Sequence, residues 1–291
     1  MNFNVIGLGE ILWDLLPAGR QLGGAPANFA YHARALGASS RVISRVGQDA
    51  LGAEILQRLE ALGLPTAEIQ VDPSAPTGTV SVTLAADGQP RFAIHEDVAW
   101  DRLALTPSAP AAIAQADAVS FGTLAQRCEP SRGTIRALLA AARPGAWRIL
   151  DLNLRQNFFS RHIIETSLRL ANIVKCNDSE LPVLAELLGL RGNARRQIEQ
   201  LSRQFGLRLV CLTRGAQGSL LYAGGQWADD PSQPVVVKDT VGAGDAFTAA
   251  LAMGLLAGQP LAVINRRANE VARHVCSREG ATPPMPDFQE P

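Results

Sequence analysis

Asp239-Thr-Val-Gly-Ala-Gly-Asp-Ala-Phe247 is a glycine-rich turn between a predicted strand and a predicted helix. The β-branched run 235–237 predicts the strand, and the Ala- and Leu-rich segment 246–257 predicts the helix. The first N–H groups of a helix lack intrahelical partners and attract anions. The glycines would let a bulky anion approach the backbone. Asp245 could then accept a proton from a hydroxyl that attacks phosphorus, or could simply cap the helix.

Around this stretch, short apolar runs alternate with helical patterns. Predicted strands cover 5–8, 41–46, 118–121, 149–152, 173–176 and 209–212, predicted helices cover 27–36 and 50–62, and residues 245–277 are helix-rich. This βαβα order predicts an α/β fold, with a mostly parallel sheet covered by helices on both faces.

Two segments do not follow the alternation. Residues 10–21 continue past the first strand as an extended stretch, and residues 77–96 alternate as a hairpin with its turn at 86–88. Together they predict a small sheet that cannot enclose a core of its own, so one of its faces must cover another part of the protein.

The composition favours a soluble globular enzyme or binding protein over a nucleic-acid or membrane protein. The 291 residues are 47% hydrophobic and 19% charged, with a formal net charge of zero, so no general attraction to polyanions is expected. No apolar run approaches the ~20 residues of a membrane span, and the N-terminus lacks the pattern of a signal peptide. The four cysteines show no CxxC spacing, which favours a reduced cytoplasmic protein over a disulfide framework or a zinc site.

Arginine supplies almost all of the positive charge, because Lys175 and Lys238 are the only lysines. Neither stands in the Gly-Lys-Ser/Thr sequence that ends a Walker A loop, so that phosphate-binding loop is absent. Phosphate chemistry here would therefore depend on backbone amides, arginine and a metal ion.

The chain resembles the ribokinase-like (PfkB) family of carbohydrate kinases in five motifs that follow the family's order. These are DTVGAGDAF at 239–247, GGAPANFAYHARALG at 23–37, DLNLR at 151–155, NDSE at 177–180 and LTRGAQG at 212–218. GGAPAN together with DxNxR most resembles the bacterial fructokinases. The resemblance implies one ribokinase-like kinase domain over residues 1–291, with a β-lid formed by about residues 10–22 and 77–98 over the sugar site.

The resemblance also implies which side chains meet the sugar. An aspartate can accept two hydrogen bonds from neighbouring hydroxyls, and an asparagine can both donate and accept. The implied substrate-binding residues are Asp14, Gly23, Gly24, Asn28, Asn153 and Asp245. The alternatives are that Asp14 is a solvated turn acid and that GGAPAN is a plain capping sequence.

Asp245 is the implied catalytic base, and the amides of Gly242, Ala243 and Gly244 are implied to stabilise the charge that builds up on the phosphoryl group. Ligands of open α/β sheets bind at the carboxyl ends of strands, where the DLNLR motif begins.

Strand alternation would put Asp151, Asn153 and Arg155 on one side of the chain. Arg155 could then steady the transferred phosphoryl group, because its planar fork suits phosphate oxygens. The alternative is a salt bridge between Arg155 and Asp151.

For ATP, the resemblance implies the loop at 213–218 and the turn at 242–244, helped by residues that flank them. The implied ATP-binding residues are Asn177, Thr213, Gly215, Gly218, Gly242, Gly244 and Asn269. Taken without the family, residues 213–218 are an ordinary β-turn.

Mg²⁺ is implied to lie near Glu180 and to be held through water, since Mg²⁺ usually keeps several waters. Alternatively, Asp178 or Ser179 caps the next helix and Glu180 completes its first turn. The resemblance also implies a K⁺ or other monovalent-cation site that begins at Asp239. Pro284 stands where ribokinases often have a serine, which weighs against activation by K⁺.

The implied activity is that of an ATP-dependent sugar kinase, in the first place a fructokinase, acting on a sugar hydroxymethyl group. One alternative is a 2-keto-3-deoxygluconate kinase, which would need Arg20 or Arg91 near the lid to meet the substrate carboxylate. Another is a catalytically silent protein that senses sugar or nucleotide. Family members often pair through the lid, so a homodimer is also implied.

Overall fold

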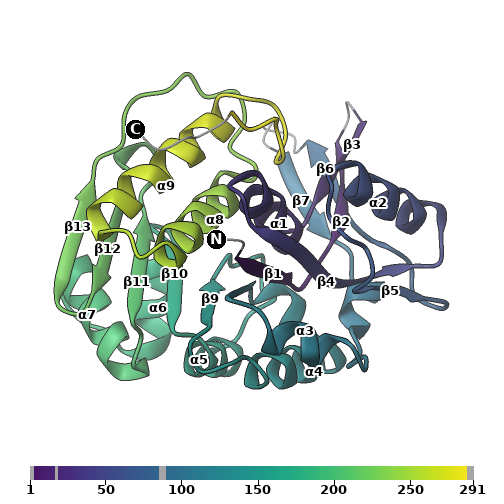
Figure 1. Ribbon diagram of the computed structural model, residues 1–291, viewed down its shortest axis with the longest axis horizontal. Helices are drawn as coiled ribbons and strands as arrows, with labels where there is room; N and C mark the ends of the chain where they lie inside the picture. The colour runs from purple at the N-terminus through teal and green to yellow at the C-terminus, as the bar shows by residue number, and fades with distance from the viewer. Residues whose placement is uncertain (1–2, 17–18, 85–89, 287–291) are drawn as a thin grey trace.

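The computed structural model describes residues 3–16, 19–84 and 90–286. Within these residues, one large sheet has the strand order β13-β12-β11-β10-β9-β8-β1-β4-β5 (Figure 1). Its strands are β1 (Asn4–Leu8), β4 (Ser39–Gly47), β5 (Ile69–Asp72), β8 (Ala118–Phe121), β9 (Trp147–Asp151), β10 (Ile173–Asn177), β11 (Leu209–Thr213), β12 (Ser219–Ala223) and β13 (Gln226–Asp230). All neighbours from β5 to β11 pair in parallel, and β12 and β13 are antiparallel. The predicted mostly parallel sheet is confirmed.

Helices cover both faces of this sheet (Figure 1). One face carries α1 (Ala25–Ala35), α8 (Ala243–Leu256) and α9 (Leu261–Cys276), and α2 (Ala50–Ala61) packs beside α1. The other face carries α3 (Ala109–Ala114), α4 (Glu129–Ala140), α5 (Arg161–Leu170), α6 (Glu180–Leu188) and α7 (Ala194–Phe205). Since both faces are buried, the strands need continuous apolar sequence, which is the signal that predicted them.

The chain changes direction across the sheet at β1. This strand pairs with β4 on one side and with β8 on the other. In open α/β sheets, a crevice for ligands forms beyond the carboxyl ends of the strands at such a switch point. The segment after β1 and the segment after β9 both leave the sheet at this edge.

A second, small sheet has the order β3-β2-β6-β7. It contains β2 (Leu12–Leu16), β3 (Gly19–Gly23), β6 (Gly78–Leu84) and β7 (Pro90–Ile94), and β6 and β7 form an antiparallel hairpin. The extended stretch and the hairpin expected from the sequence are therefore present. The predicted turn at 86–88 lies outside the described residues.

Alternation gives β2 two different faces. Trp13 is buried towards α2, where its Nε1 donates to the Leu51 carbonyl oxygen at 3.0 Å. Asp14 lies on the opposite face, which it shares with its neighbour in the parallel ladder, the buried Val80. The small sheet is thus anchored on one side and presents a carboxylate on the other.

The prediction of a strand at 235–237 is wrong. Residues 231–241 contain no strand, and Val236 is 83% exposed. A strand needs a partner for its backbone groups, and here the Lys238 N–H donates instead to the carbonyl of Cys276 at the end of α9. β-branched residues alone were therefore an insufficient signal.

Candidate active site

The glycine-rich turn does lead into a helix, as predicted. Gly242 precedes the first residue of α8 and has a φ of 77°, a left-handed conformation that favours glycine. A Cβ on Gly242 would also lie 2.5 Å from the Ala281 carbonyl oxygen. Among the described residues, the N–H groups of Gly242 and Gly244 have no acceptor, whereas Ala243 donates to the Thr240 carbonyl oxygen at 3.3 Å. Two of the three predicted amides are thus free for an anion.

Asp245 stands in the first turn of α8, directly after these amides. Asn28, in the first turns of α1, donates from Nδ2 to Asp245 Oδ2 at 2.8 Å. Loss of water around the carboxyl, and next the negative charge of Asp151, raise the pKa of Asp245 to about 7, although the Asn28 hydrogen bond opposes this. A carboxyl with a pKa near neutrality suits a general base.

Beneath Asp245 lies a buried ion pair that the sequence did not predict. Lys175 Nζ donates to both carboxylate oxygens of Asp151 at 2.8 Å, and Thr248 Oγ1 donates to Asp151 Oδ2 at 2.9 Å. Burial alone would lower the pKa of Lys175, but the Asp151 carboxylate raises it overall. The proposed salt bridge between Asp151 and Arg155 is therefore wrong, because Asp151 is occupied by Lys175.

The segment after β9 does not continue as a strand. The strand ends at Asp151, and Asn153 has a φ of 43°, so the alternation expected for 151, 153 and 155 does not hold. Arg155 is exposed, and its Nη1 is 3.3 Å from the Leu154 carbonyl oxygen. The Arg155 charge lowers the pKa values of Asp14, Glu10 and Asp245, so its guanidinium is near enough to act on all three carboxyls electrostatically.

The small sheet contributes Asp14 to the same crevice. Asp14 belongs to β2 rather than to a turn, and burial raises its pKa to about 6 against the opposing charge of Arg155. A Cβ on Gly23 would lie 2.5 Å from Asp14 Oδ2, and one on Gly24 would lie 2.6 Å from the Glu10 carbonyl oxygen. The two glycines are thus needed at least for packing around these two acidic residues.

Glu180 lies between the ends of β9 and β10. Its Oε1 accepts from the Leu154 N–H and its Oε2 from the Asn177 N–H, each at 2.8 Å. Ser179 occupies the N-cap position of α6 and Glu180 its first turn, as the alternative had it, but the side chain that accepts the N–H groups of Ser179 and Glu180 is Asn177 through Oδ1. No group of three His, Cys, Asp or Glu side chains suited to hold a metal occurs in the part of the chain that the structure describes. A single carboxylate, Glu180, fits a Mg²⁺ ion that would be bound mainly by phosphate oxygens and that Glu180 would reach through water.

The predicted nucleotide loop joins β11 to the antiparallel β12. It contains Thr213, the short helix η3 (Gly215–Gln217) and Gly218, whose φ is 76°. A Cβ on Gly218 would lie 1.9 Å from the Asp230 carbonyl oxygen. Asn269 of α9 is buried and donates from Nδ2 to Ser219 Oγ at 2.8 Å. Asn269 therefore holds the first residue of β12, which directly follows this loop.

Asp239 accepts hydrogen bonds from the turn before α8 and from the segment after α9. Its Oδ1 accepts the Val241 N–H and its Oδ2 the Gly280 N–H, both at 3.0 Å. His32 is fully buried, contacts the Ala281 carbonyl oxygen at 2.9 Å through Nε2, and has a pKa lowered to about 4 by burial. This environment gives His32 a structural role.

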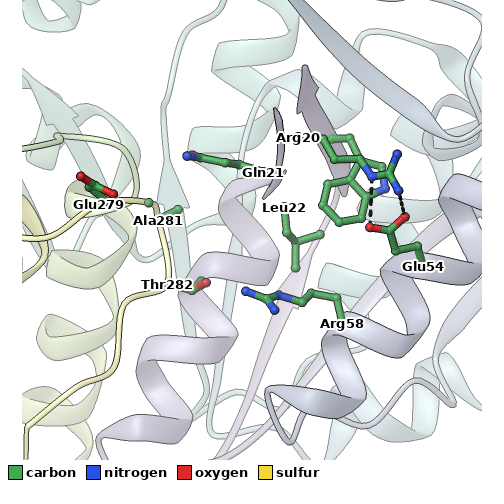
Figure 2. Close-up of a pocket in the computed structure, with 10 residues that line it drawn as sticks. Arg20, Gln21, Leu22, Glu54, Arg58, Glu279, Ala281 and Thr282 are labelled. Carbon is green, nitrogen blue, oxygen red and sulfur yellow. Dashed lines mark hydrogen bonds and ion pairs between the residues drawn. The ribbon is translucent and has the colours of Figure 1, made fainter. Parts of the chain in front are cut away.

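A cavity of about 390 Å³ lies beside the small sheet, between β3, α2 and residues 279–282 (Figure 2). Arg20 forms its edge, paired with Glu54 and stacked 5.5 Å from the centre of the Trp13 ring. Because Arg20 pairs with Leu15 across the strands, it lies on the face opposite Asp14. The cavity wall does not include Asp14, Asn28 or Asp245.

Two residues of this crevice were missed by sequence reasoning, Lys175 and Glu10. A lysine inside the apolar run Ile173–Asn177 is a signal that could have been used, since a buried lysine needs a carboxylate partner. Glu10 comes shortly after the end of β1, and Asp151 is the last residue of β9. For Glu10 the available signal was an acidic residue just beyond a buried strand.

The chain was compared with known proteins. The family model described as pfkB family carbohydrate kinase matches residues 18–287. A fructokinase from Klebsiella pneumoniae is 33% identical over 268 residues, which cover 88% of this chain and 86% of that enzyme. A protein of Pyrococcus horikoshii named as a sugar kinase is 30% identical over 296 residues, covering 95% and 91% of the two chains.

Solved structures agree with these matches. A Vibrio cholerae fructokinase, solved with fructose, ADP and a calcium ion, superposes with a TM-score of 0.81 at 25% identity and covers 97% of this chain and 95% of its own. The Pyrococcus horikoshii sugar kinase, solved in complex with ATP, has a TM-score of 0.79 at 29% identity, with coverages of 96% and 94%. Within the described residues, no helix is long and apolar enough to cross a membrane.

Proposed function

Because the chain belongs to the PfkB family of carbohydrate kinases, we propose that it is a fructokinase, which transfers the γ-phosphate of ATP to a hydroxymethyl group of fructose. The single observation that carries this proposal is the arrangement of Asp245, with a pKa near 7, directly after free backbone amides at the start of α8. Fructokinases from Klebsiella pneumoniae and Escherichia coli, 33% and 31% identical, support fructose as the acceptor.

In the proposed reaction, the sugar lies between Asp14 of the small sheet and Asp245. Asp245 takes the proton of the hydroxymethyl group as its oxygen attacks the γ-phosphorus. The free amides of Gly242 and Gly244 stabilise the charge that develops, and Arg155 adds a positive charge to the site. Gly23, Gly24, Asn28 and Asn153 complete the proposed sugar site, and the small sheet excludes water that would otherwise hydrolyse ATP.

ATP is proposed to lie over the loop at 213–218 and the start of α8, with Asn177 and Asn269 holding the loop positions. Mg²⁺, when bound, would neutralise phosphate charge. Glu180 would reach it through water because its two oxygens already accept backbone N–H groups. Asp239 is the proposed start of a K⁺ site, to which Pro284 contributes no side-chain oxygen.

We also propose that residues 1–291 form one kinase domain with a lid at about 10–22 and 77–98, and that this lid joins two copies of the chain. A cytoplasmic location is supported by the four cysteines, which are all unpaired.

The test is coupled ADP release with fructose, ribose, tagatose, adenosine and 2-keto-3-deoxygluconate as acceptors. Fructose is expected to give the highest kcat/KM. The acid 2-keto-3-deoxygluconate is expected to be poorer, because Arg20 is neutralised by Glu54 and faces away from Asp14. The side chain of Arg91 lies outside the described residues. ADP release that is independent of every sugar would contradict the proposal, and no ADP release at all would contradict it and favour the sensing protein.

The Asp14→Ala variant should raise the KM for the sugar by roughly 10- to 100-fold, because it removes a charged acceptor of sugar hydroxyls. The KM for ATP should change little, since Asp14 lies on β2, away from the loop at 213–218. Steady-state kinetics with each substrate varied in turn checks this. A change confined to the KM for ATP would reverse the assignment of the two ends of the crevice.

The Arg155→Lys variant should lower kcat on the order of tenfold, since the charge remains but the planar fork is lost. Thermal stability should change little, because Arg155 is exposed and makes one long contact to Leu154. Turnover and melting temperature measured on the same preparation distinguish the two effects. A lower melting temperature with unchanged kcat would assign Arg155 a structural role instead.

A further inference from the structure

Glu10 is a buried carboxyl that the proposed reaction does not use. It follows β1 at the switch point of the sheet and is only 2% exposed. Its own backbone N–H reaches the carboxyl, but Oε2 has no hydrogen-bond partner among the described residues. An ionised carboxylate in this position would be costly, because burial without a partner disfavours charge.

The groups that face Glu10 come from three elements. Asp245 is on α8, Asp151 ends β9, and Arg155 follows β9. The charge of Asp151 is already offset by Lys175, and Arg155 is exposed to solvent. Among the acids whose charge acts on Glu10, Asp245 is therefore the one that no ion pair offsets, and two neighbouring carboxylates rarely ionise together.

A second observation shows that a hydrogen-bond donor is missing here. Asn28 uses Nδ2 to hold Asp245, but its Oδ1 is also buried without a partner in the described part of the chain. Two buried acceptor atoms, Glu10 Oε2 and Asn28 Oδ1, thus belong to neighbouring segments, because the Glu10 backbone packs against Gly24 at the start of α1, and neither atom has a donor among the described residues. One proton on Glu10 would turn an acceptor into a donor and reduce this deficit.

We propose that Glu10 is a positioning residue that keeps its proton as a neutral carboxylic acid and donates a hydrogen bond towards the Asp245–Asn28 pair, so that Asp245 carries the negative charge. The proton of the substrate hydroxyl then goes to Asp245 alone. Glu10 has no part in bond breaking. Its effect on turnover rests on the proposed function, whereas its protonation state can be measured without it.

Burial, followed by the charge of Asp245, raises the pKa of Glu10 to about 7, against the opposing hydrogen bond from its own N–H. A carboxyl whose folded pKa is raised contributes stability below its unfolded pKa and loses it as the pH rises through the folded value. Wild-type protein should therefore lose stability by this route as the pH rises from about 4.5 to about 7, and the neutral variant Glu10→Gln should not.

The experiment that requires no activity is thermal unfolding of wild type and Glu10→Gln between pH 5 and 9. The melting temperature of Glu10→Gln relative to wild type should rise between pH 5 and about pH 7 and stay constant above it, where the folded and the unfolded wild type have both lost the proton. Glu186→Gln, an exposed glutamate of α6, is the matched control and should show no such trend. A difference that stays constant over the whole pH range, or falls with rising pH, would overturn the neutral carboxylic acid.

The kinetic experiment uses Glu10→Gln and Glu10→Met in the sugar-dependent assay. Glu10→Gln keeps a donor and should retain kcat within about threefold, with the acid limb of kcat/KM unchanged. Glu10→Met lacks the donor, so its acid limb should move to higher pH, because Asp245 becomes a stronger base. A large loss in Glu10→Gln, or acid limbs that coincide in both variants, would overturn the proposal. A wild type without sugar-dependent turnover would contradict the proposed function and leave the unfolding result to decide the state of Glu10.

Discussion

Asp245→Asn is expected to lower kcat by at least about 10²-fold, the usual contribution of a general base. The amide has nearly the same size and can still occupy the first turn of α8, so the fold should persist. It cannot accept the proton of the sugar hydroxyl at neutral pH. Turnover under saturating sugar and ATP, together with circular dichroism of the same sample, measures both effects.

The matched control is Asp117→Asn, which makes the same chemical change at the amino end of β8, on the opposite edge of the sheet. It should keep kcat near the wild-type value even if the Arg143 ion pair is weakened. If Asp245→Asn keeps more than about a tenth of wild-type turnover, Asp245 is not the base, and the role of the α8 amides would have to be considered separately.

The pH dependence of the wild type follows from the same carboxyl. Asp245 is active when ionised, and its pKa is raised to about 7, so kcat/KM should fall as the pH is lowered through this value. The contribution of Asp245 to the stability of the fold changes with pH in the opposite direction to its contribution to activity. The raised pKa means that folding favours the protonated carboxyl, so stability from this group is lost as the pH rises through about 7.

The sheet could be predicted because its strands are buried on both faces and therefore read as continuous apolar runs. Residues 118–121 were predicted with their observed limits, and β1, β4, β9, β10 and β11 differ from prediction by one or two residues at their ends, whereas no limits were predicted for β5, β12 and β13. The same reasoning was wrong at 235–237, where the apolar run lies exposed and has no strand beside it. Local composition shows what a strand tolerates but not whether a partner strand is present.

The candidate site was less predictable, because its parts meet only through the register of distant strands. The ladder pairs Lys175 directly with Asp151, and this pairing decides that Arg155 is left free to face the crevice. The left-handed backbone at Asn153 suits asparagine, which adopts this conformation more readily than most residues, but the residue type alone does not show that the strand ends before it. Motifs identified the residues, and the fold was needed to say which of them touch.

Lys175→Met is expected to destabilise the protein by about 3–5 kcal/mol, the usual result of leaving one member of a buried ion pair without its partner. Lys175 and Asp151 have side chains that are each 7% exposed, so solvent screens the uncompensated Asp151 carboxylate very little. Denaturant unfolding at pH 8 measures this loss. Lys238→Met changes the only other lysine of the chain, which is exposed, and should leave stability nearly unchanged.

The double variant Lys175→Met/Asp151→Asn separates the charge effect from lost packing. Removing the orphaned carboxylate should recover a large part of the stability, because the remaining amide can still accept from Thr248. Activity should not recover with stability, since the pair also sets the charge around Asp245: Asp151 raises the Asp245 pKa and Lys175 lowers it. If the double variant is no more stable than Lys175→Met, the loss comes from packing of the lysine stem. In that case the ion pair stabilises the fold far less than its geometry suggests.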